Sequence, residues 1–321
     1  MKILVTGGSG FLGSRLIAKL VRDGQQVFAL ARSTSADSKV RALGATPVRG
    51  DLGSPETITL PELDAVAHAA AYFRFAGPRA PYFQTNVNGT IALLRAAKKA
   101  GAKKFVYVSA AAVVMDKCGS PLRNVDESAK TFPDSFSAYI ASKAQGEAAV
   151  LAADQPGFRT IALRPPGIWG PGDAFSRELP RLIKSGQFAF IKRGDYPFTT
   201  CHVDNVVEAI SCAIDSDLGG RVYFIGDSDT LTFREFVAGL AETQGLSVDK
   251  LRSVPYGLAF TMGRLMELVT SADRDPPMTR TMVRLIGVEF TTDDSAARRE
   301  LGYVGKISRA EGLATYRAQA A

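Results

Sequence analysis

The stretch Met1-Lys2-Ile3-Leu4-Val5-Thr6-Gly7-Gly8-Ser9-Gly10-Phe11-Leu12-Gly13 decides the fold, because it predicts a buried strand that turns at once into a helix. The glycines have no Cβ, so the chain can turn sharply and a phosphate can approach the backbone. The helix that begins near Phe11 directs its free N–H groups and its positive dipole end at this turn, which suits a pyrophosphate. Gly10 permits the close approach, and Gly13 lets helix and strand pack tightly.

Two overlapping glycine patterns, Gly8-x-Gly10-x-x-Gly13 and Gly7-x-x-Gly10-x-x-Gly13, are weak when taken alone, since a glycine turn is often only a tight connection. Their context is more specific. They open the chain, follow a strand, begin an amphipathic helix and lead to a second predicted strand over residues 26–31. This βαβ unit predicts dinucleotide binding.

Length and composition predict one large globular unit or a domain with an appended lobe, since the chain has 321 residues and is 46% apolar. No apolar stretch reaches the ~18 residues of a membrane span. The most suggestive one, residues 254–269, carries Arg264 and Glu267. The apolar start is also too short for a signal peptide.

Three cysteines without metal-ligand spacing, Cys118, Cys201 and Cys212, cannot all pair, which favours a reducing, cytoplasmic setting. With only two histidines, we expect no metal centre. The net charge of +7 is not gathered into a basic cluster with interleaved aromatic residues, so we expect no nucleic-acid partner. The surplus suits an anionic cofactor. The oligomeric state stays open, a homodimer included.

Alternating strand and helix patterns predict an α/β fold, a doubly wound Rossmann sheet whose ligands bind at the carboxyl ends of parallel strands. The predicted strands cover residues 26–31, 45–50, 65–70, 104–109 and 158–164, and the predicted helices 36–43, 82–100 and 137–153.

Beyond Arg164 the pattern changes. Residues 165–172 are turn-rich, and helices are predicted over 177–185, 203–216, 233–243, 256–269 and 278–285. Residues 222–225 are predicted to return to the main sheet as a strand, so the second lobe is discontinuous. We therefore assign residues 1–169 with 200–228 to the dinucleotide-binding domain, and residues 170–199 with 229–321 to a smaller substrate lobe.

Six motifs stand in the order found in extended short-chain dehydrogenases/reductases of the NAD-dependent epimerase/dehydratase superfamily. They are Gly7-x-x-Gly10-x-x-Gly13, His68-Ala69-Ala70-Ala71, Asn86-Val87-Asn88-Gly89-Thr90, Tyr139-x-x-x-Lys143, Arg164-Pro165-Pro166 and His202-Val203-Asp204-Asn205. Residues 297–303 and 308–313 resemble the C-terminal end of the family. The resemblance covers nearly the whole chain and is strongest to the 3β-hydroxysteroid dehydrogenase and dihydroflavonol reductase branch.

The resemblance implies that Tyr139 is the catalytic acid/base and that Lys143 assists it and holds the nicotinamide ribose. The two are four apart on one predicted helix, so both side chains project from one face. A free tyrosine titrates near ~10, so work near neutrality requires about 3 units, or ~4 kcal/mol, of preference for the phenolate. A neighbouring ammonium and the positive nicotinamide supply it.

The cofactor site that the resemblance implies extends along most of the first half of the chain. It comprises Gly7, Ser9, Gly10, Phe11, Leu12, Gly13, Arg32, Asp51, Leu52, Ala69, Ala70, Ala71, Tyr139, Lys143, Pro166 and Ile168. NAD-dependent relatives place an acid at the end of the second strand, where this chain has Ala31 followed by Arg32. A guanidinium there binds a 2′-phosphate, which predicts NADP(H) in preference to NAD(H). Alternatively, Arg32 is a solvated loop residue.

One position departs from the family pattern. Relatives end the strand before the active site with two hydroxyl residues, the second of which hydrogen-bonds the reacting carbonyl, whereas this chain has Ser109-Ala110. We expect Ser109 to face away if the strand is regular through Ala110. Ser109 then acts as the catalytic hydroxyl only if a shifted turn brings it inward.

Other polar or aromatic residues receive structural interpretations. His68 and His202 are expected to be hydrogen-bonded structural residues, and Trp169 is expected to pack at the lobe junction. Asn86 either holds the active-site helix, orders a water or is a plain N-cap.

The second lobe bears on the substrate. Phe198 stands where sugar-nucleotide relatives place an arginine for the diphosphate, which argues against a nucleotide sugar. The stripe Leu258, Phe260, Met262, Leu265 and Met266 either lines an apolar pocket or is ordinary lobe core.

These observations predict hydride transfer between NADP(H) and a secondary alcohol or ketone of a largely apolar small molecule. Two alternatives remain at this stage. One is a nucleotide-sugar epimerase or dehydratase on the same fold, and the other is an NADP-binding regulatory protein without turnover.

Overall fold

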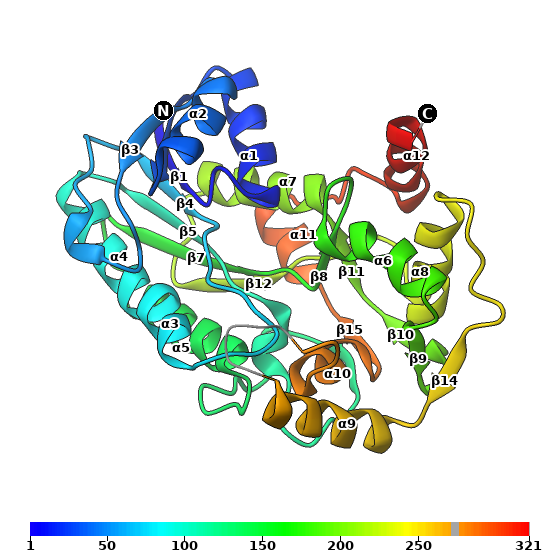
Figure 1. The fold of residues 1–321 in the computed structure, drawn as a ribbon. Coiled ribbons are helices and arrows are strands. Elements are labelled where there is room, and N and C mark those ends of the chain that lie inside the picture. The colour runs from blue at the N-terminus through cyan, green and yellow to red at the C-terminus, as the bar shows by residue number, and fades with distance from the viewer. Residues whose placement is uncertain (271–275, 321) are drawn as a thin grey trace.

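A parallel sheet organises the first and larger part of the computed structural model, which describes residues 1–270 and 276–320, with side chains up to Arg317 (Figure 1). Seven described strands pair in the order β12-β7-β5-β4-β1-β2-β3, every pair parallel. They are β1 (Lys2–Thr6), β2 (Gln26–Ala31), β3 (Thr46–Arg49), β4 (Ala65–His68), β5 (Lys104–Val108), β7 (Arg159–Arg164) and β12 (Arg221–Phe224). The order reverses between β1 and β4, and in open parallel sheets ligands bind at the carboxyl ends of the strands beside such a reversal.

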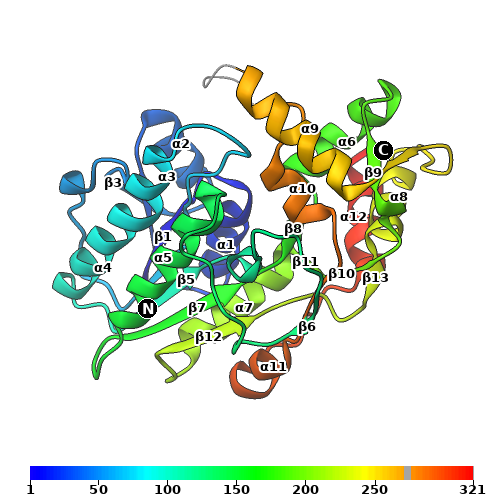
Figure 2. The same ribbon diagram turned by 90° about the horizontal axis from the view of Figure 1, so that it is seen from below.

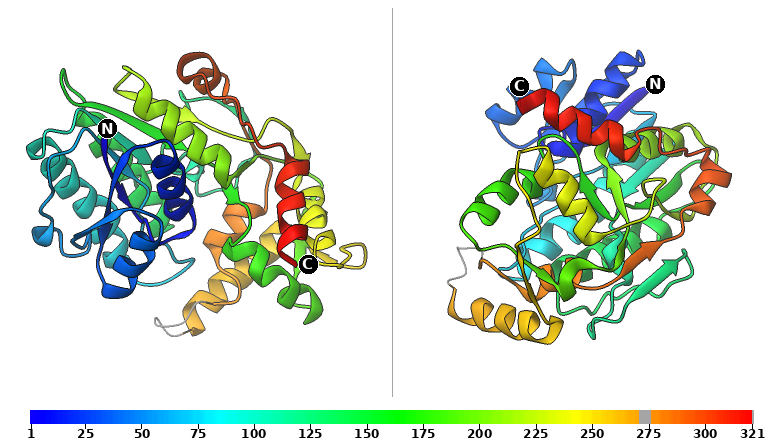
Figure 3. Two further views of the ribbon diagram at one scale, coloured as in Figure 1. Left: turned by 90° about the horizontal axis from the view of Figure 1, so that it is seen from above. Right: turned by 90° about the vertical axis from the view of Figure 1, so that its right-hand side faces the viewer.

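Helices cover both faces of this sheet. Its central strands are largely apolar, as strands buried on both sides are. On one face, α1 (Phe11–Arg22), α2 (Thr34–Ala42) and α7 (Val203–Asp215) share a core that includes Leu16, Val40 and Val206. On the other, α4 (Thr90–Lys99) and α5 (Ala138–Ala152) bury Leu94 and Val150 (Figures 1 and 3). The doubly wound fold and the return of β12 to the sheet are thus confirmed.

The helix predicted over residues 82–100 is interrupted. The chain forms α3 (Ala80–Phe83), then a π-helical segment Gln84–Gly89, and only then α4. A Cβ added at Gly89 would lie 2.5 Å from the Leu52 carbonyl oxygen, so the segment passes close to the loop after β3. π-helical turns are frequent at functional sites, and this one contains Asn86.

The second lobe is built around a small mixed sheet in the order β13-β10-β15-β6. Its strands are β6 (Leu122–Val125), β10 (Pro197–Phe198), β13 (Leu231–Thr232) and β15 (Phe290–Thr292), and two parallel pairs join β8 (Gly167–Trp169) to β11 (Thr200–His202) and β9 (Ala189–Ile191) to β14 (Arg252–Val254). Its helices are α6 (Ala174–Lys184), α8 (Phe233–Glu242), α9 (Tyr256–Val269), α10 (Arg280–Ile286) and α12 (Arg309–Ala320). Figure 2 shows this lobe beside the main sheet, with α9 along its outer edge.

Two segments cross the division predicted between the domains, whose boundaries stay a prediction. Strand β6 lies within residues 1–169 but pairs with β15 of the small sheet. Conversely, α11 (Ser295–Leu301) and Tyr303 pack into the core of the main sheet. Each predicted domain therefore contributes a segment that packs with the other. No helix among the described residues is long and apolar enough to cross a bilayer.

Candidate active site

The turn between β1 and α1 is closed by glycine geometry. Gly7 has a φ of +73°, and its carbonyl accepts a hydrogen bond from the Gly10 N–H at 2.9 Å. A Cβ at Gly13 would lie 2.2 Å from the Gly7 carbonyl oxygen, and one at Gly7 would lie 3.0 Å from the Ala70 nitrogen. No side chain caps α1 and no acid lies in its first turn. The free N–H groups therefore remain available to an anion, so this turn fits a pyrophosphate.

The other predicted cofactor residues lie around this turn or at the neighbouring strand ends. Ala69, Ala70 and Ala71 continue from β4, while Pro166 and Ile168 follow β7. Leu52 is buried, and the Asp51 carboxylate accepts the Gly53 N–H at 2.9 Å. Ser9, Gly10 and Ala71 are exposed, as a ligand surface requires.

The end of β2 is cationic. Arg32 follows Ala31 directly and is exposed. Arg49 lies next to it, since its Nη1 donates to the Ala31 carbonyl at 3.5 Å while its Nη2 pairs with Asp37. Asp37, the acid nearest in sequence on α2, is therefore already engaged by a guanidinium. The sequence analysis did not anticipate Arg49.

His68 joins β4 to two threonines. Its Nδ1 lies 2.7 Å from Thr6 Oγ1, and its Nε2 lies 2.9 Å from Thr90 Oγ1. The Thr90 hydroxyl donates to the Asn86 carbonyl, so it accepts from Nε2–H, and the Thr6 hydroxyl donates to Nδ1. Burial, helped by Lys143, lowers the pKa of His68 to about 3. The imidazole is thus neutral, and the predicted structural role is confirmed.

Asn86 connects this network to the active-site helix. Its Oδ1 accepts the Tyr72 N–H at 2.7 Å, and its Nδ2 donates to the Tyr72 carbonyl and to Ser142 Oγ on α5, at 3.1 and 3.0 Å. The plain N-cap interpretation is wrong, because Asn86 lies inside the π-helical segment. Asn86 holds α5. Ser142 was missed, although its place beside Lys143 on the predicted helix was visible.

Helix α5 places Tyr139 and Lys143 one turn apart, as predicted. Lys143 is buried, donates to the Val108 carbonyl at 2.6 Å and has its Nζ 4.0 Å from the centre of the Tyr107 ring. Burial lowers the pKa of Lys143 to about 7, against the opposing effect of Glu147. Burial raises the pKa of Tyr139 to about 12. In the protein alone, the shift of the tyrosine is therefore opposite to the one expected, and the phenol keeps its proton.

The next turn of α5 carries a buried charge pair. Glu147 accepts from Arg164 of β7 through two hydrogen bonds, at 2.7 and 3.0 Å, and both side chains are almost wholly buried. The Arg164 guanidinium lies over the Phe224 ring at 5.2 Å. Tyr139, Lys143 and Glu147 thus follow one another at helical spacing. Glu147 was missed, although its spacing from Lys143 could have identified it.

The serine position is unusual in the structure as well. Strand β5 ends at Val108, and Ala110 remains extended. The methyl group of Ala110 packs in the cluster that includes Ile140 and contacts Tyr139. Ser109 is buried, and its Oγ has no hydrogen-bond partner among the described residues. The catalytic role of Ser109 stays a prediction.

Aromatic side chains lie between Tyr139 and the second lobe. The Phe73 ring, 46% exposed, meets the Tyr139 ring edge to face at 4.7 Å. Phe136, just before α5, meets Phe260 of α9 at 5.8 Å. One ring pair thus lies at Tyr139, and the other joins the residue just before α5 to α9. The predicted stripe on α9 named Phe260, but sequence patterns gave no sign of Phe73 or Phe136.

A buried carboxylate that the sequence analysis missed, Asp227, contacts Arg309 of the second lobe at 3.5 Å. It accepts the Trp169 Nε1–H and the His202 N–H, both at 2.7 Å, and the Asn205 amide at 2.9 Å. His202 caps α7 by accepting the Asp204 N–H. The structural roles predicted for Trp169 and His202 are confirmed. Asp227 follows a strand end after Gly226, a position that sequence analysis could have noticed.

Two expectations about the second lobe have different outcomes. Phe198 is buried with its ring 5.2 Å from that of Phe233, so no cation occupies this position. The stripe on α9 is lobe core only in part, because Phe260 packs against the buried cluster that contains Ala259, whereas Leu258 and Leu265 are more than half exposed. Periodicity alone could not show that two of its five side chains stay open to solvent.

Comparisons with known proteins agree with this architecture. The model of the 3-beta hydroxysteroid dehydrogenase/isomerase family matches residues 4–256. The chain is 40% identical to the 4-hydroxy-2-methyl-3-oxo-4-farnesyl-3,4-dihydroquinoline-1-oxide ketoreductase of Stigmatella aurantiaca, covering 98% of this chain and 95% of that protein. It is 33% identical to the 2-alkyl-3-oxoalkanoate reductase of Stenotrophomonas maltophilia, with both chains fully covered.

Solved structures share the fold. A dTDP-glucose 4,6-dehydratase from Streptomyces venezuelae, determined with NAD bound, is 25% identical with a TM-score of 0.75, covering 99% of this chain and 96% of that one. A UDP-glucose 4-epimerase from Thermotoga maritima has a TM-score of 0.76 over 100% of this chain and 99% of the other, at 22% identity. The latter shows the fold alone.

Proposed function

The chain belongs to the 3-beta hydroxysteroid dehydrogenase/isomerase family, and we propose that it is an NADP(H)-dependent reductase of ketones on largely apolar molecules. It is an oxidoreductase with a nicotinamide cofactor, acting on hydroxyl or keto groups. The observation that supports the proposal best is a hydrogen-bond network that connects the glycine turn to α5. The network includes Thr6, His68, Asn86 and Ser142. This network fixes a cofactor cradle against a helix that carries a tyrosine and a lysine.

We assign the cofactor to the glycine turn and the adjacent strand ends. The cofactor supplies the hydride when bound. Gly7, Gly10 and Gly13 would hold the pyrophosphate, since side chains there would fill the cradle. Lys143, buried beneath the site, would hold a ribose hydroxyl and keep α5 in place through the Val108 carbonyl. Arg32, exposed beside Ala31, would bind the 2′-phosphate that distinguishes NADP from NAD.

Tyr139 is the proposed proton donor. Its pKa of about 12 keeps the phenol protonated at neutral pH, the form needed to deliver a proton to a ketone oxygen as it becomes an alcohol. After the transfer, a nearby ammonium favours the phenolate, and Lys143 at a pKa of about 7 is charged in part of the molecules. In the reverse direction the same phenolate accepts the proton of an alcohol.

The substrate that we propose is apolar. The relatives named above act on a farnesylated quinoline and on alkyl-oxoalkanoates. The Phe73 ring, exposed beside Tyr139, offers a compatible surface. Phe198 argues against a nucleotide sugar, because a buried phenyl ring cannot pair with a diphosphate. We also place the protein in the reducing cytoplasm, which suits three free cysteines.

Cofactor oxidation by the purified full-length chain tests the proposal. We expect NADPH to be consumed with apolar 3-oxo compounds, and NADH to be consumed less efficiently. Consumption of neither cofactor across a broad ketone panel would contradict the enzymatic proposal. Calorimetry with UDP- and dTDP-sugars is the second arm, in which micromolar binding would contradict the apolar substrate.

A further inference from the structure

Phe73 is the only exposed aromatic side chain in the part of the chain that the structure describes. The chain has 18 phenylalanines, nine tyrosines and one tryptophan, and all the others are buried or half-buried. One exposed apolar side chain is ordinary on a protein surface. Phe73 differs in its neighbour, because its ring lies 4.7 Å from the ring of Tyr139, the proposed proton donor.

Two rings contact Phe73 and leave 46% of the residue open. Tyr139 meets its ring at an interplanar angle of 78°, and Phe75 meets it at 75° with the ring centres 4.9 Å apart. Both contacts are edge to face, a geometry in which the positive edge of one ring attracts the negative face of another. Phe73 is therefore the middle ring of three, and its open part belongs to the surface around the proton donor.

Buried side chains hold the backbone on both sides of Phe73. Asn86 accepts the Tyr72 N–H at 2.7 Å and donates to the Tyr72 carbonyl at 3.1 Å. On the other side, the hydroxyl of the buried Tyr82 donates to the Arg74 carbonyl at 2.7 Å. Because the residues before and after it are both fixed, Phe73 presents its ring in a narrow range of directions.

The segment that carries Phe73 is also tied to the start of α5. The Arg79 guanidinium donates through Nη1 to the carbonyls of Ser135 and Phe136, at 3.4 and 3.2 Å. These two residues lie just before the helix that carries Tyr139. Hydrogen bonds that involve neither ring thus hold the Phe73 segment and α5 together. A side chain preset in this way loses little conformational entropy when a ligand binds to it.

We propose that Phe73 is a specificity-determining residue of the substrate site, and that it selects ketones with a flat aromatic ring attached to the reacting carbonyl. The inference rests on the proposed reductase function, in which Tyr139 gives its proton to a ketone oxygen. A carbonyl at the Tyr139 hydroxyl brings its substituent to the neighbouring Phe73 ring. A flat ring there extends the row of aromatic contacts, whereas a saturated ring of the same size makes only the apolar contact.

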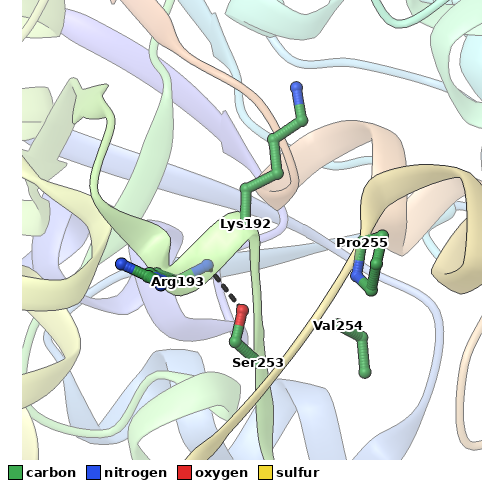
Figure 4. A pocket seen from close by; sticks show the side chains of 5 residues that line it. All are labelled: Lys192, Arg193, Ser253, Val254 and Pro255. Atoms are coloured by element: carbon green, nitrogen blue, oxygen red, sulfur yellow. Dashed lines mark hydrogen bonds between the residues drawn. The ribbon is translucent and has the colours of Figure 1, made fainter.

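A hollow in the second lobe does not offer this chemistry. It has a volume of about 470 Å³ and is lined by Lys192, Arg193, Ser253, Val254 and Pro255. Figure 4 shows its two cationic side chains leaving their loop in different directions. None of the lining residues is aromatic, and none belongs to α5. The contact with Tyr139 therefore selects the surface at Phe73 as the place for the substrate ring.

A matched pair of ketones tests the inference. Ethyl 3-oxo-3-phenylpropanoate and ethyl 3-cyclohexyl-3-oxopropanoate differ only in a flat ring against a puckered one. Calorimetry on the full-length protein saturated with NADP⁺, which has no hydride to give, measures both Kd values without turnover. The quantity compared between variants is the ratio of the two Kd values, because it cancels effects that both ketones share.

Two substitutions separate the ring of Phe73 from its bulk. Phe73→Leu keeps an apolar side chain and should shift the Kd ratio by about fivefold against the phenyl compound. Phe73→Tyr keeps a ring and should preserve the ratio of the unaltered protein. The control Val304→Ala changes an apolar side chain that is 54% exposed outside this region, and it should leave both Kd values unchanged. All three variants should bind NADPH as the unaltered protein does.

The possible outcomes distinguish this inference from the proposed function. An unshifted ratio in Phe73→Leu would overturn the inference, as would an equal shift in Phe73→Tyr. Failure of both ketones to bind would overturn it as well. If the ratio shifts as expected but NADPH is not consumed with either ketone, Phe73 is confirmed as a contact for flat rings and the proposed reductase function fails.

Discussion

Helices α5 and α9 depart from the usual surface helix in opposite ways. On the side packed against the sheet, α5 buries Lys143 and Glu147, whereas α9 buries only Ala259 and Gly263 and exposes leucines. Buried polar groups must find partners inside the protein, and those of α5 do, in Val108 and Arg164. Exposed leucines find no partner in the chain itself. The first departure therefore marks polar groups that the fold itself satisfies, and the second leaves apolar surface open to solvent.

The largest expected effect is the loss of reductase activity when Tyr139 of α5 is replaced. Replacing Tyr139 by phenylalanine removes the proposed proton donor and leaves the ring contact with Phe73. General acid catalysis contributes about 10²–10⁴-fold, so NADPH-dependent reduction should fall by at least a hundredfold. Steady-state measurements of kcat/KM determine this loss of activity. Retained activity in Tyr139→Phe would show that another group donates the proton.

The next effect concerns the buried charge pair of α5. Glu147→Gln leaves the Arg164 guanidinium buried without its carboxylate, which typically costs about 3–5 kcal/mol of folding free energy. The matched control is Glu178→Gln on α6, whose ion pair with Arg181 is exposed and should cost less than about 1 kcal/mol. Urea unfolding compares the two. Equal losses would mean that burial does not distinguish these pairs.

Glu147→Gln should also shift the pH dependence of kcat/KM. The Glu147 carboxylate raises the pKa of Lys143, opposing the burial that brings it down to about 7. Without that charge the pKa falls further, so the ammonium is lost at a lower pH. The alkaline limb of the kcat/KM profile should therefore move to lower pH in Glu147→Gln. An unmoved limb would mean that Lys143 does not titrate in the active range.

Much of this arrangement could be predicted from the sequence. The glycine turn, the parallel sheet and the pair Tyr139 and Lys143 all follow from local patterns, because they depend on spacing and on strand and helix periodicity. The partners could be predicted only in part. That Asn86 holds the active-site helix was one of the expectations, but its bond to Ser142 and the bond of Thr90 to His68 form only after the chain has folded. A π-helical turn in place of a regular helix positions Asn86.

The failure on α9 has a different cause. Periodicity locates an apolar stripe but does not say which side of the helix faces the protein. Here the small residues Ala259 and Gly263 decide, because only they let α9 approach the chain before α10. The pKa of Tyr139 likewise depends on the folded environment, because burial raises it to about 12 in the protein alone. The lowering expected with a positive nicotinamide beside the phenol stays a prediction.

A smaller effect is expected at the cofactor edge, where the charge is exposed and acts on a ligand. Arg32→Ala should weaken NADPH binding by about tenfold, since one charge-assisted contact to the 2′-phosphate is lost. NADH binding should be unchanged. Titration of both cofactors measures this difference. An equal loss for both would indicate that Arg32 contacts a part that the two cofactors share, and no loss would make it a solvated residue.

The serine position comes next in size. Ser109 Oγ has no partner among the described residues, and the Ala110 methyl lies in the cluster that contacts Tyr139. We therefore expect Ser109→Ala to change kcat/KM by no more than a few fold. Ala110→Ser should leave the rate equal or raise it, because a hydroxyl there adds a donor for the developing oxyanion. If Ser109→Ala is as inactive as Tyr139→Phe, Ser109 is the catalytic hydroxyl after all.

The smallest effect belongs to α9 and sharpens the contrast with α5. Leu265→Gln replaces a large apolar side chain that is 57% exposed, so the free energy of unfolding should stay within about 0.5 kcal/mol. On the inner face of the same helix, Gly263→Ala adds one methyl group against Thr279 and should cost about 1–3 kcal/mol. Thermal unfolding measures both. If Leu265→Gln were the more damaging change, this side chain would be packed inside the protein and the contrast with α5 would fail.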